Sequence, residues 1–325
     1  NGSFHQAQLQ LARQANKSLF TFYKNTGKYV GLAPAVILGL FDKLISPILN
    51  YASEVWGFHK APDIERVHLK FCKKLLWVKT SAQNDFVYGE LGRYPMLNIR
   101  MFRIIKYWIG IVQGGKSYWV NVCYQNSLNE LDVSNATGWT RSVRDMLFRL
   151  GFGEVWFSQG VGDVNSFLKL FKSRINDISQ QDWHNRLENS SRASFYRVIK
   201  DMPSFSKYSE IVHVKSHRHA LSRLITSSHP LRIESGRWEQ PVIPRERRHC
   251  YFCPNVVEDE YHFVFECSIY NDLRTQLIPR YFRVRPSMWK LTQLFKSTNR
   301  RHILGLSKFA YKAFIQRNER ISILA

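Results

Sequence analysis

The sequence lacks a hydrophobic run long enough to cross a membrane. Its longest apolar stretch, residues 32–41, is followed at once by Asp42 and Lys43, whereas a membrane-spanning helix needs about 20 predominantly apolar residues. No signal peptide is visible at the N-terminus. The chain begins with Asn1 rather than Met, as expected of a fragment or a processed product. We therefore expect an intracellular protein, in the nucleus and cytoplasm, with no membrane partner.

Cysteine is scarce and odd in number. The chain has 5 cysteines, and three of them fall between positions 250 and 267. An odd count without a secretory signal argues against a disulfide framework. A reducing, intracellular compartment fits this pattern better.

Acidic residues are few relative to basic ones. The sequence has 25 Asp and Glu against 47 Lys and Arg, which gives a net charge of +22. So positive a surface is typical of proteins that bind nucleic acid, an anionic membrane or an acidic partner. Hydrophobic residues make up 44% of the sequence, which excludes a disordered tail, and the length allows two domains.

Strand-like alternation of apolar and polar residues is also scarce, whereas helical spacing is frequent. This pattern predicts a mainly α fold without a large sheet. A polar stretch at 126–138 predicts a loop and a domain boundary. Helices are expected at about 3–27, 34–49, 62–78, 95–112, 140–150, 164–175, 180–199, 270–281 and 289–321.

The three clustered cysteines form part of a metal-ligand pattern. Cys250 and Cys253 are separated by two residues, and His262 and Cys267 follow. Three thiolates and one imidazole in tetrahedral geometry suit zinc, and four protein ligands leave no open position, so the site is expected to be structural. His249 is an alternative to His262 as the fourth ligand. Free cysteines beside a surface histidine are the other reading of this pattern.

A basic run leads directly into the first metal ligand. A rigid metal turn would hold these cations in a fixed array, and arginine can bond two phosphate oxygens at once. A solvated charge run is the alternative, and for the tryptophan in this set the alternative is core packing. The candidate nucleic-acid contacts are Arg237, Trp238, Arg245, Arg247, Arg248 and His249.

Catalytic signatures are missing. His184 lies near Asp182, but no nucleophile motif or recognisable partner spacing accompanies them. The glycines at 151 and 153 are not followed by the Lys-Ser/Thr of a phosphate-binding loop. We therefore expect no catalytic residues in this chain.

Two parts of the sequence resemble the C-terminal region of non-LTR (LINE-type) retrotransposon polyproteins. The later part consists of HALSRLITSSHPLRIESGRW and RERRHCYFCPNVVEDEYHFVFECSIYNDLR, which resemble the stretch that follows the reverse transcriptase. The earlier part consists of LFDKLISPILNYASEVWG and ERVHLKFCKKLLWVKTSAQNDFVYGELGRYPM, which are similar to the region just after the polymerase palm.

The resemblance implies a reverse transcriptase thumb within residues 1–92, followed by a connecting and zinc-knuckle region that helps to bind the element RNA or the target DNA. It also implies that Cys250, Cys253, His262 and Cys267 are the metal ligands, and that the upstream palm and fingers of the same polypeptide are partners. The paired aspartates of the family's Tyr/Phe-Ala-Asp-Asp motif do not occur here. Since polymerase chemistry needs clustered carboxylates to hold its metal ions, we expect no polymerase activity from this chain alone, although the parent polyprotein would be an RNA-directed DNA polymerase.

The sequence as a whole predicts a mainly α protein in two parts. Residues 1–125 would form a thumb-like and connecting helical domain, residues 126–138 a linker, and residues 139–325 a basic helical domain with a zinc knuckle at 250–267. The expected function is to position RNA or DNA within a retrotransposon ribonucleoprotein. The alternative is a zinc-containing helical scaffold for protein interactions, whose binding would not weaken steeply with salt.

Overall fold

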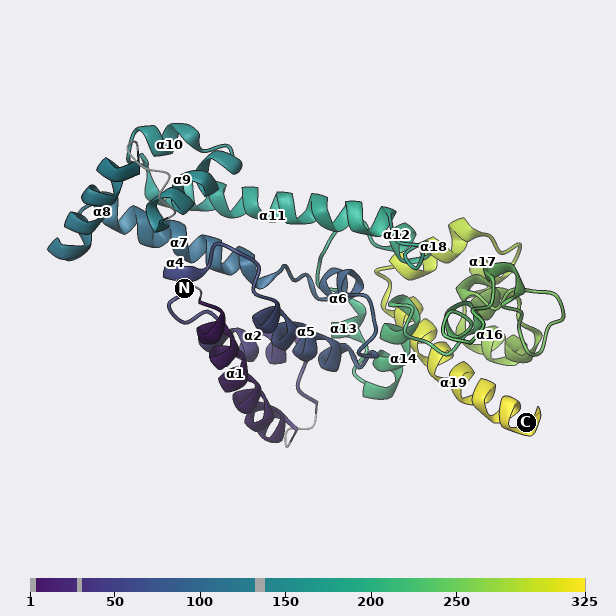
Figure 1. Cartoon of the computed structure of the whole chain (residues 1–325). Coiled ribbons are helices and arrows are strands. Elements are labelled where there is room, and N and C mark those ends of the chain that lie inside the picture. Colours follow the sequence, from purple (N-terminus) through teal and green to yellow (C-terminus); the bar gives the residue numbers. More distant parts are fainter. Residues whose placement is uncertain (1–3, 28–30, 132–137, 325) are drawn as a thin grey trace. The chain divides into compact units, whose positions relative to one another are not determined.

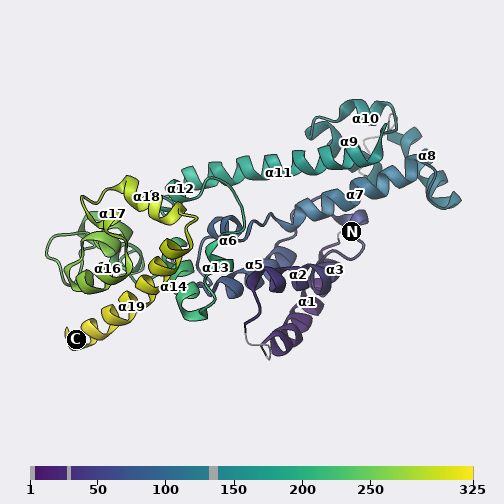
Figure 2. The ribbon, with the colours of Figure 1, turned by 180° about the vertical axis from the view of Figure 1, so that it is seen from behind.

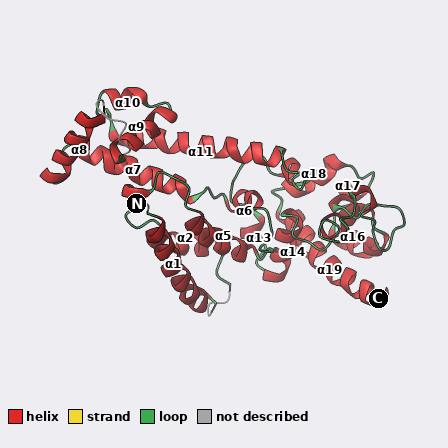
Figure 3. Cartoon of the chain, in the orientation of Figure 1, coloured by secondary structure: helices red, strands yellow, loops and turns green. Residues whose placement is uncertain are grey.

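Helices account for most of the chain in the computed structural model, which describes residues 4–27, 31–131 and 138–324. Figure 3 shows no strand among these residues, and their only β-bridges are two isolated antiparallel pairs, Leu91 with Phe205 and His249 with Val257. The predicted mainly α fold class is therefore confirmed. Within the described ranges, no helix combines the length and the apolar character needed to cross a membrane.

The chain divides into two compact units, each built from separate stretches of sequence. Within the described residues, the first unit takes 4–27, 39–68 and 94–182, and the second takes 31–38, 69–93 and 183–324. This division differs from the predicted boundary at 126–138, because residues 139–182 fold with the first unit. Residues 126–131 form the end of a helix rather than a loop, and 132–137 lie outside the described residues.

The first unit packs around a tryptophan-centred core. Trp108 is fully buried, and its indole N–H donates to the Tyr124 hydroxyl at 2.8 Å. Three helices, α2, α5 and α11, contribute residues to both units. The helices of the first unit and these three are α1 (His5–Thr26), α2 (Pro34–Leu44), α3 (Ser46–Leu49), α4 (Ser53–Trp56), α5 (Pro62–Leu76), α7 (Met96–Val112), α8 (Tyr118–Leu131), α9 (Trp139–Arg149), α10 (Gly153–Phe157) and α11 (Val164–Glu188).

The second unit consists of shorter elements gathered on one long C-terminal helix. Its α-helices are α6 (Asn84–Leu91), α12 (Tyr196–Ile199), α13 (Tyr208–Ile211), α14 (Lys215–Ile225), α15 (Arg232–Ser235), α16 (Asn271–Leu277), α17 (Arg280–Arg283), α18 (Met288–Lys296) and α19 (Arg300–Leu324). Its tighter and wider helical turns are η1 (Arg245–Arg247), η2 (His262–Glu266) and η3 (Ser268–Tyr270).

The core of the second unit lies where α14 packs along α19, which lie side by side in Figures 1 and 2. Phe309 of α19 is fully buried, and its ring meets that of Phe263 at 5.6 Å between centroids. Phe314, one turn further along, stacks on the same Phe263 ring at 4.9 Å. The aromatic residue that follows His262 therefore anchors the cysteine-rich segment to α19.

Most predicted helices are present, and the differences concern where individual helices begin and end. The predicted helix at 34–49 divides into α2 and α3, near the bend expected from Pro47. The predicted helices at 164–175 and 180–199 are instead one continuous helix, α11, which ends at Glu188. Pro279 separates α16 from α17, because proline cannot donate the backbone hydrogen bond of a continuing helix.

Candidate metal centre

A short hairpin carries the first two cysteines. The N–H of Cys250 donates to the carbonyl of Val256 at 2.8 Å, and the N–H of Glu258 donates to the carbonyl of Arg248 at 2.9 Å. Within the loop that the first bond closes, the chain turns at Asn255. Its φ of 56° lies in the left-handed region that asparagine tolerates better than most residues. The tight turn places Cys253 on the same side as Cys250.

A wide helical turn carries the other two residues. The N–H of Cys267 donates to the carbonyl of His262 at 2.8 Å, which is the five-residue bond of a π-helix. In a regular α-helix, residues five apart point about 140° away from each other, so the wider turn brings His262 and Cys267 closer to one face. The Asp259 carboxylate accepts the N–H of His262 at 2.8 Å and fixes the start of this turn.

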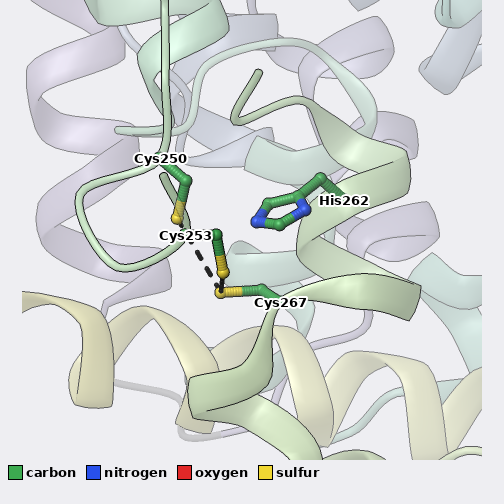
Figure 4. Close-up of side chains that lie close together, drawn as sticks. All are labelled: Cys250, Cys253, His262 and Cys267. Carbon is green, nitrogen blue, oxygen red and sulfur yellow. Dashed lines mark hydrogen bonds between the residues drawn. The ribbon is translucent and has the colours of Figure 1, made fainter. Parts of the chain in front are cut away.

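The four side chains converge on one point, as Figure 4 shows. Their ligand atoms all lie within 4.8 Å of one another. The Sγ of Cys267 is 3.8 Å from the Sγ of Cys250 and 3.9 Å from that of Cys253. These separations are far longer than a disulfide bond of about 2.05 Å, so the sulfurs are free thiols.

The imidazole of His262 gives independent support for a ligand. The residue is 3% exposed, and both ring nitrogens are buried without a hydrogen-bond partner among the described residues. One nitrogen faces the three sulfurs in Figure 4, while Nδ1 lies 3.5 Å from the Glu266 carboxylate. Because buried polar atoms are rarely left without partners, the four residues have the geometry of a site that could hold a metal ion.

The electrostatics of the cluster favour the thiolate form of one cysteine, Cys250. A hydrogen bond with Cys267 lowers the pKa of Cys250 to about 4, although burial opposes this shift. The same hydrogen bond raises the pKa of Cys267. Burial lowers the pKa of His262, but the negative charge of the neighbouring Cys250 and Cys253 thiolates outweighs burial and raises that pKa to about 9. Thiolate is the form of cysteine that binds metals.

Buried arginines hold this loop in place from outside it. Arg274 is 5% exposed and donates to the carbonyls of Val264 at 2.8 Å and Cys267 at 2.7 Å. Arg317 of α19 makes two bonds of 2.7 Å to the Glu258 carboxylate. Glu258 directly follows the hairpin bridge, so the hairpin is tied to α19 by a buried ion pair.

The predicted nucleic-acid contacts fall into two groups: residues that bond to other parts of the protein, and residues that lie nearer the surface. Arg248 is 6% exposed, and its guanidinium donates to the carbonyls of Ile243 and Ile233. Arg237 pairs with Glu234 at 3.0 Å and has a side chain that is 19% exposed. These two arginines hold the local fold, because their N–H groups are directed at protein oxygens.

The remaining candidates lie nearer the surface. Arg245 and Arg247 are exposed on η1, immediately before the hairpin. Trp238 is 64% exposed, and the Arg192 guanidinium lies 5.8 Å from its ring centroid. His249 is half-buried at the bridge with Val257, outside the group of four ligands.

Local spacing in the sequence predicted the four clustered residues but not the buried arginines, Arg274 and Arg317, that bond to this segment. Arg317 lies 59 positions beyond Glu258, and Arg274 looks like any other cation of a basic helix. Only the run of three acids at 258–260, unusual in so basic a chain, could have signalled a buried partner. No protein family, curated protein or solved structure matches the chain.

Proposed function

We propose that this chain binds nucleic acid through a basic face organised by one structural zinc ion, as the region following the reverse transcriptase in a LINE-type retrotransposon polyprotein. The observation that carries the proposal is the convergence of Cys250, Cys253, His262 and Cys267, the first of which follows two exposed arginines closely in the sequence. The resemblance of the sequence to that region of LINE-type polyproteins supports the same reading.

The donor set and its spacing favour zinc. With zinc–sulfur bonds near 2.3 Å, tetrahedral geometry separates two sulfur ligands by about 3.8 Å. The separations of 3.8 and 3.9 Å between the Sγ of Cys267 and those of Cys250 and Cys253 fit this value. Since Glu266 lies beside Nδ1 of His262, Nε2 would be the ligand atom, and the carboxylate would orient the ring as an outer partner.

Four protein ligands leave no place for a substrate, so the ion would serve the fold rather than catalysis. The hairpin is too short to bury a core of its own, and metal binding would supply part of its folding free energy. Arg245 and Arg247 would then be held at a fixed distance from the metal turn, with Trp238 exposed nearby in the sequence. An exposed arginine can bond two phosphate oxygens at once. Catalysis of polymerisation would remain with the upstream palm and fingers.

The test is a salt titration of RNA and DNA binding by the zinc-loaded protein. Each phosphate contact that is neutralised steepens the dependence of affinity on salt. The Arg245→Ala/Arg247→Ala variant is expected to reduce the slope of log K against log salt by about 2. The matched control is Lys169→Ala/Lys172→Ala, which removes two exposed cations of α11 in the first unit.

The outcomes separate the two function classes. A smaller slope for the arginine variant than for the lysine variant supports the proposed face. Equal slopes contradict the placement of the contact at η1. Absence of binding to RNA and DNA at low salt contradicts the nucleic-acid function and favours a zinc-containing protein scaffold.

A further inference from the structure

An exposed tryptophan occupies a strained position at the end of α5. Trp77 is 51% exposed and has a φ of 57°, in the left-handed region that disfavours residues other than glycine. The N–H of Val78 donates to the carbonyl of Lys73 at 3.1 Å, a bond that closes a helix end at which glycine normally sits. A large side chain kept in such a conformation indicates a role for its ring.

The ring of Trp77 lies parallel to an imidazole of α14. The two centroids are 5.0 Å apart and the planes differ by 7°. His219 has a pKa lowered to about 4, first by burial and then by the charges of Arg218, Lys215 and Arg223. The stacked partner is therefore a neutral ring at neutral pH, and the pair presents an aromatic surface rather than a charge.

Three cations of α14 lie near this aromatic pair. The ammonium of Lys215 lies 5.7 Å from the Trp77 centroid, and Arg218 and Arg223 act on His219 from the same helix. An exposed aromatic ring within a positive field combines the two features that bind single-stranded nucleic acid, namely a stacking surface and phosphate-binding cations.

The segment after Trp77 is fixed to the second unit. The N–H of Lys79 donates to the buried hydroxyl of Ser228 at 2.8 Å, and the Lys73 ammonium donates to the carbonyl of Thr80 at 2.7 Å. All of these residues belong to the second unit. The ring is thus held in place by the backbone on both sides of it, which lowers the entropic cost of stacking a ligand on it.

We propose that Trp77, stacked on His219, is a platform for an unpaired nucleobase, and that Lys215 holds the phosphate beside that base. This inference rests on the proposed nucleic-acid function and narrows it to single-stranded segments. A base within a duplex already has both faces covered by its neighbours, so it cannot stack on a protein ring without leaving the helix.

The experiment compares binding of a short single-stranded RNA, the matching single-stranded DNA and a duplex of the same sequence. The principal variant is Trp77→Gly, because glycine suits a φ of 57° and preserves the helix end while removing the ring. Trp77→Phe keeps an aromatic face. Trp119→Ala is the control, since Trp119 is 73% exposed but lies in the first unit.

Loss of one base–tryptophan stack is worth about 1–3 kcal/mol, so Trp77→Gly is expected to weaken single-strand binding about 5- to 150-fold. Duplex binding and the salt slope are expected to stay as in the parent protein, and Trp77→Phe should recover most of the affinity. Lys215→Ala is expected to reduce the salt slope by about 1. Thermal melting of each variant establishes that it is folded.

Trp77→Gly binding as tightly as Trp119→Ala would overturn the platform while leaving the proposed function in place. An equal loss for single strands and duplex would overturn its restriction to unpaired bases. If the parent protein binds none of the three probes, the proposed function fails together with the inference.

Discussion

Replacing Arg317 by methionine is expected to destabilise the second unit by about 3–5 kcal/mol, because it leaves a buried carboxylate without its counter-ion. The side chains of Arg317 and Glu258 are 4% and 2% exposed, and two bonds of 2.7 Å join them. After the substitution Glu258 would retain the backbone N–H of Arg232, at 2.7 Å, as a partner. One neutral donor does not compensate a buried negative charge.

The cost of the unpaired Glu258 carboxylate can be separated from the cost of lost packing by adding Glu258→Gln to the Arg317→Met variant. Glutamine is uncharged and still offers an oxygen to the N–H of Arg232, so the double variant is expected to be more stable than Arg317→Met alone. Urea unfolding gives the free-energy differences, and hydrogen exchange of residues 250–267 reports whether the hairpin loosens.

Lys296→Met is the matched control. Its partner is Asp201, at 2.8 Å, and the two side chains are 35% and 72% exposed. An exposed ion pair of this kind contributes about 0–1 kcal/mol. If Arg317→Met cost no more than Lys296→Met, the account of a hairpin anchored by a buried ion pair would be refuted.

Three further changes test other parts of the structure. Cys253→Ser is expected to make residues 250–267 more sensitive to protease and to weaken RNA or DNA binding, and unchanged cleavage together with unchanged binding would refute that link. Arg274→Met removes two hydrogen bonds to buried carbonyls and is expected to lower the free energy of urea unfolding by about 2–4 kcal/mol. A decrease below about 1 kcal/mol would contradict the role of Arg274 in holding this loop in place. His219 has a folded pKa of about 4 against 6.5 for the free side chain, so the unfolded chain binds the proton more tightly and stability falls as pH drops from 6.5 to 4. The His219→Gln variant should show a shallower fall across that window, and an identical pH profile would argue against a neutral, buried ring.

The four residues of the candidate metal site could be predicted from the sequence because they lie close together along the chain. Cys250 and Cys253 share one tight turn, which their two-residue spacing favours. His262 and Cys267 are also close in sequence, but the wider π-helical turn is what brings them toward one face. Whether an individual arginine side chain points into the protein or into solvent could not be predicted in this way. Arg248 and Arg247 are neighbours in one basic run, yet one is buried against carbonyls and the other is exposed.

The division of the chain into two units could not be predicted from local sequence patterns either. A polar stretch at 126–138 predicted a boundary, but residues 126–131 continue α8 because polar side chains are compatible with the solvent-facing side of a helix. The continuous helix α11 contributes residues to both units, which only long-range packing decides. Trp77 gave no signal in the sequence beyond helical spacing, since its left-handed backbone is visible only in the structure.

Elemental mass spectrometry of freshly purified, reduced protein tests most directly the proposal that Cys250, Cys253, His262 and Cys267 hold one zinc ion. We predict close to one zinc per chain in the parent protein and its loss in His262→Ala, with the zinc retained in the control variant His249→Ala. The absence of zinc from the parent protein, or its retention in His262→Ala, would contradict the account.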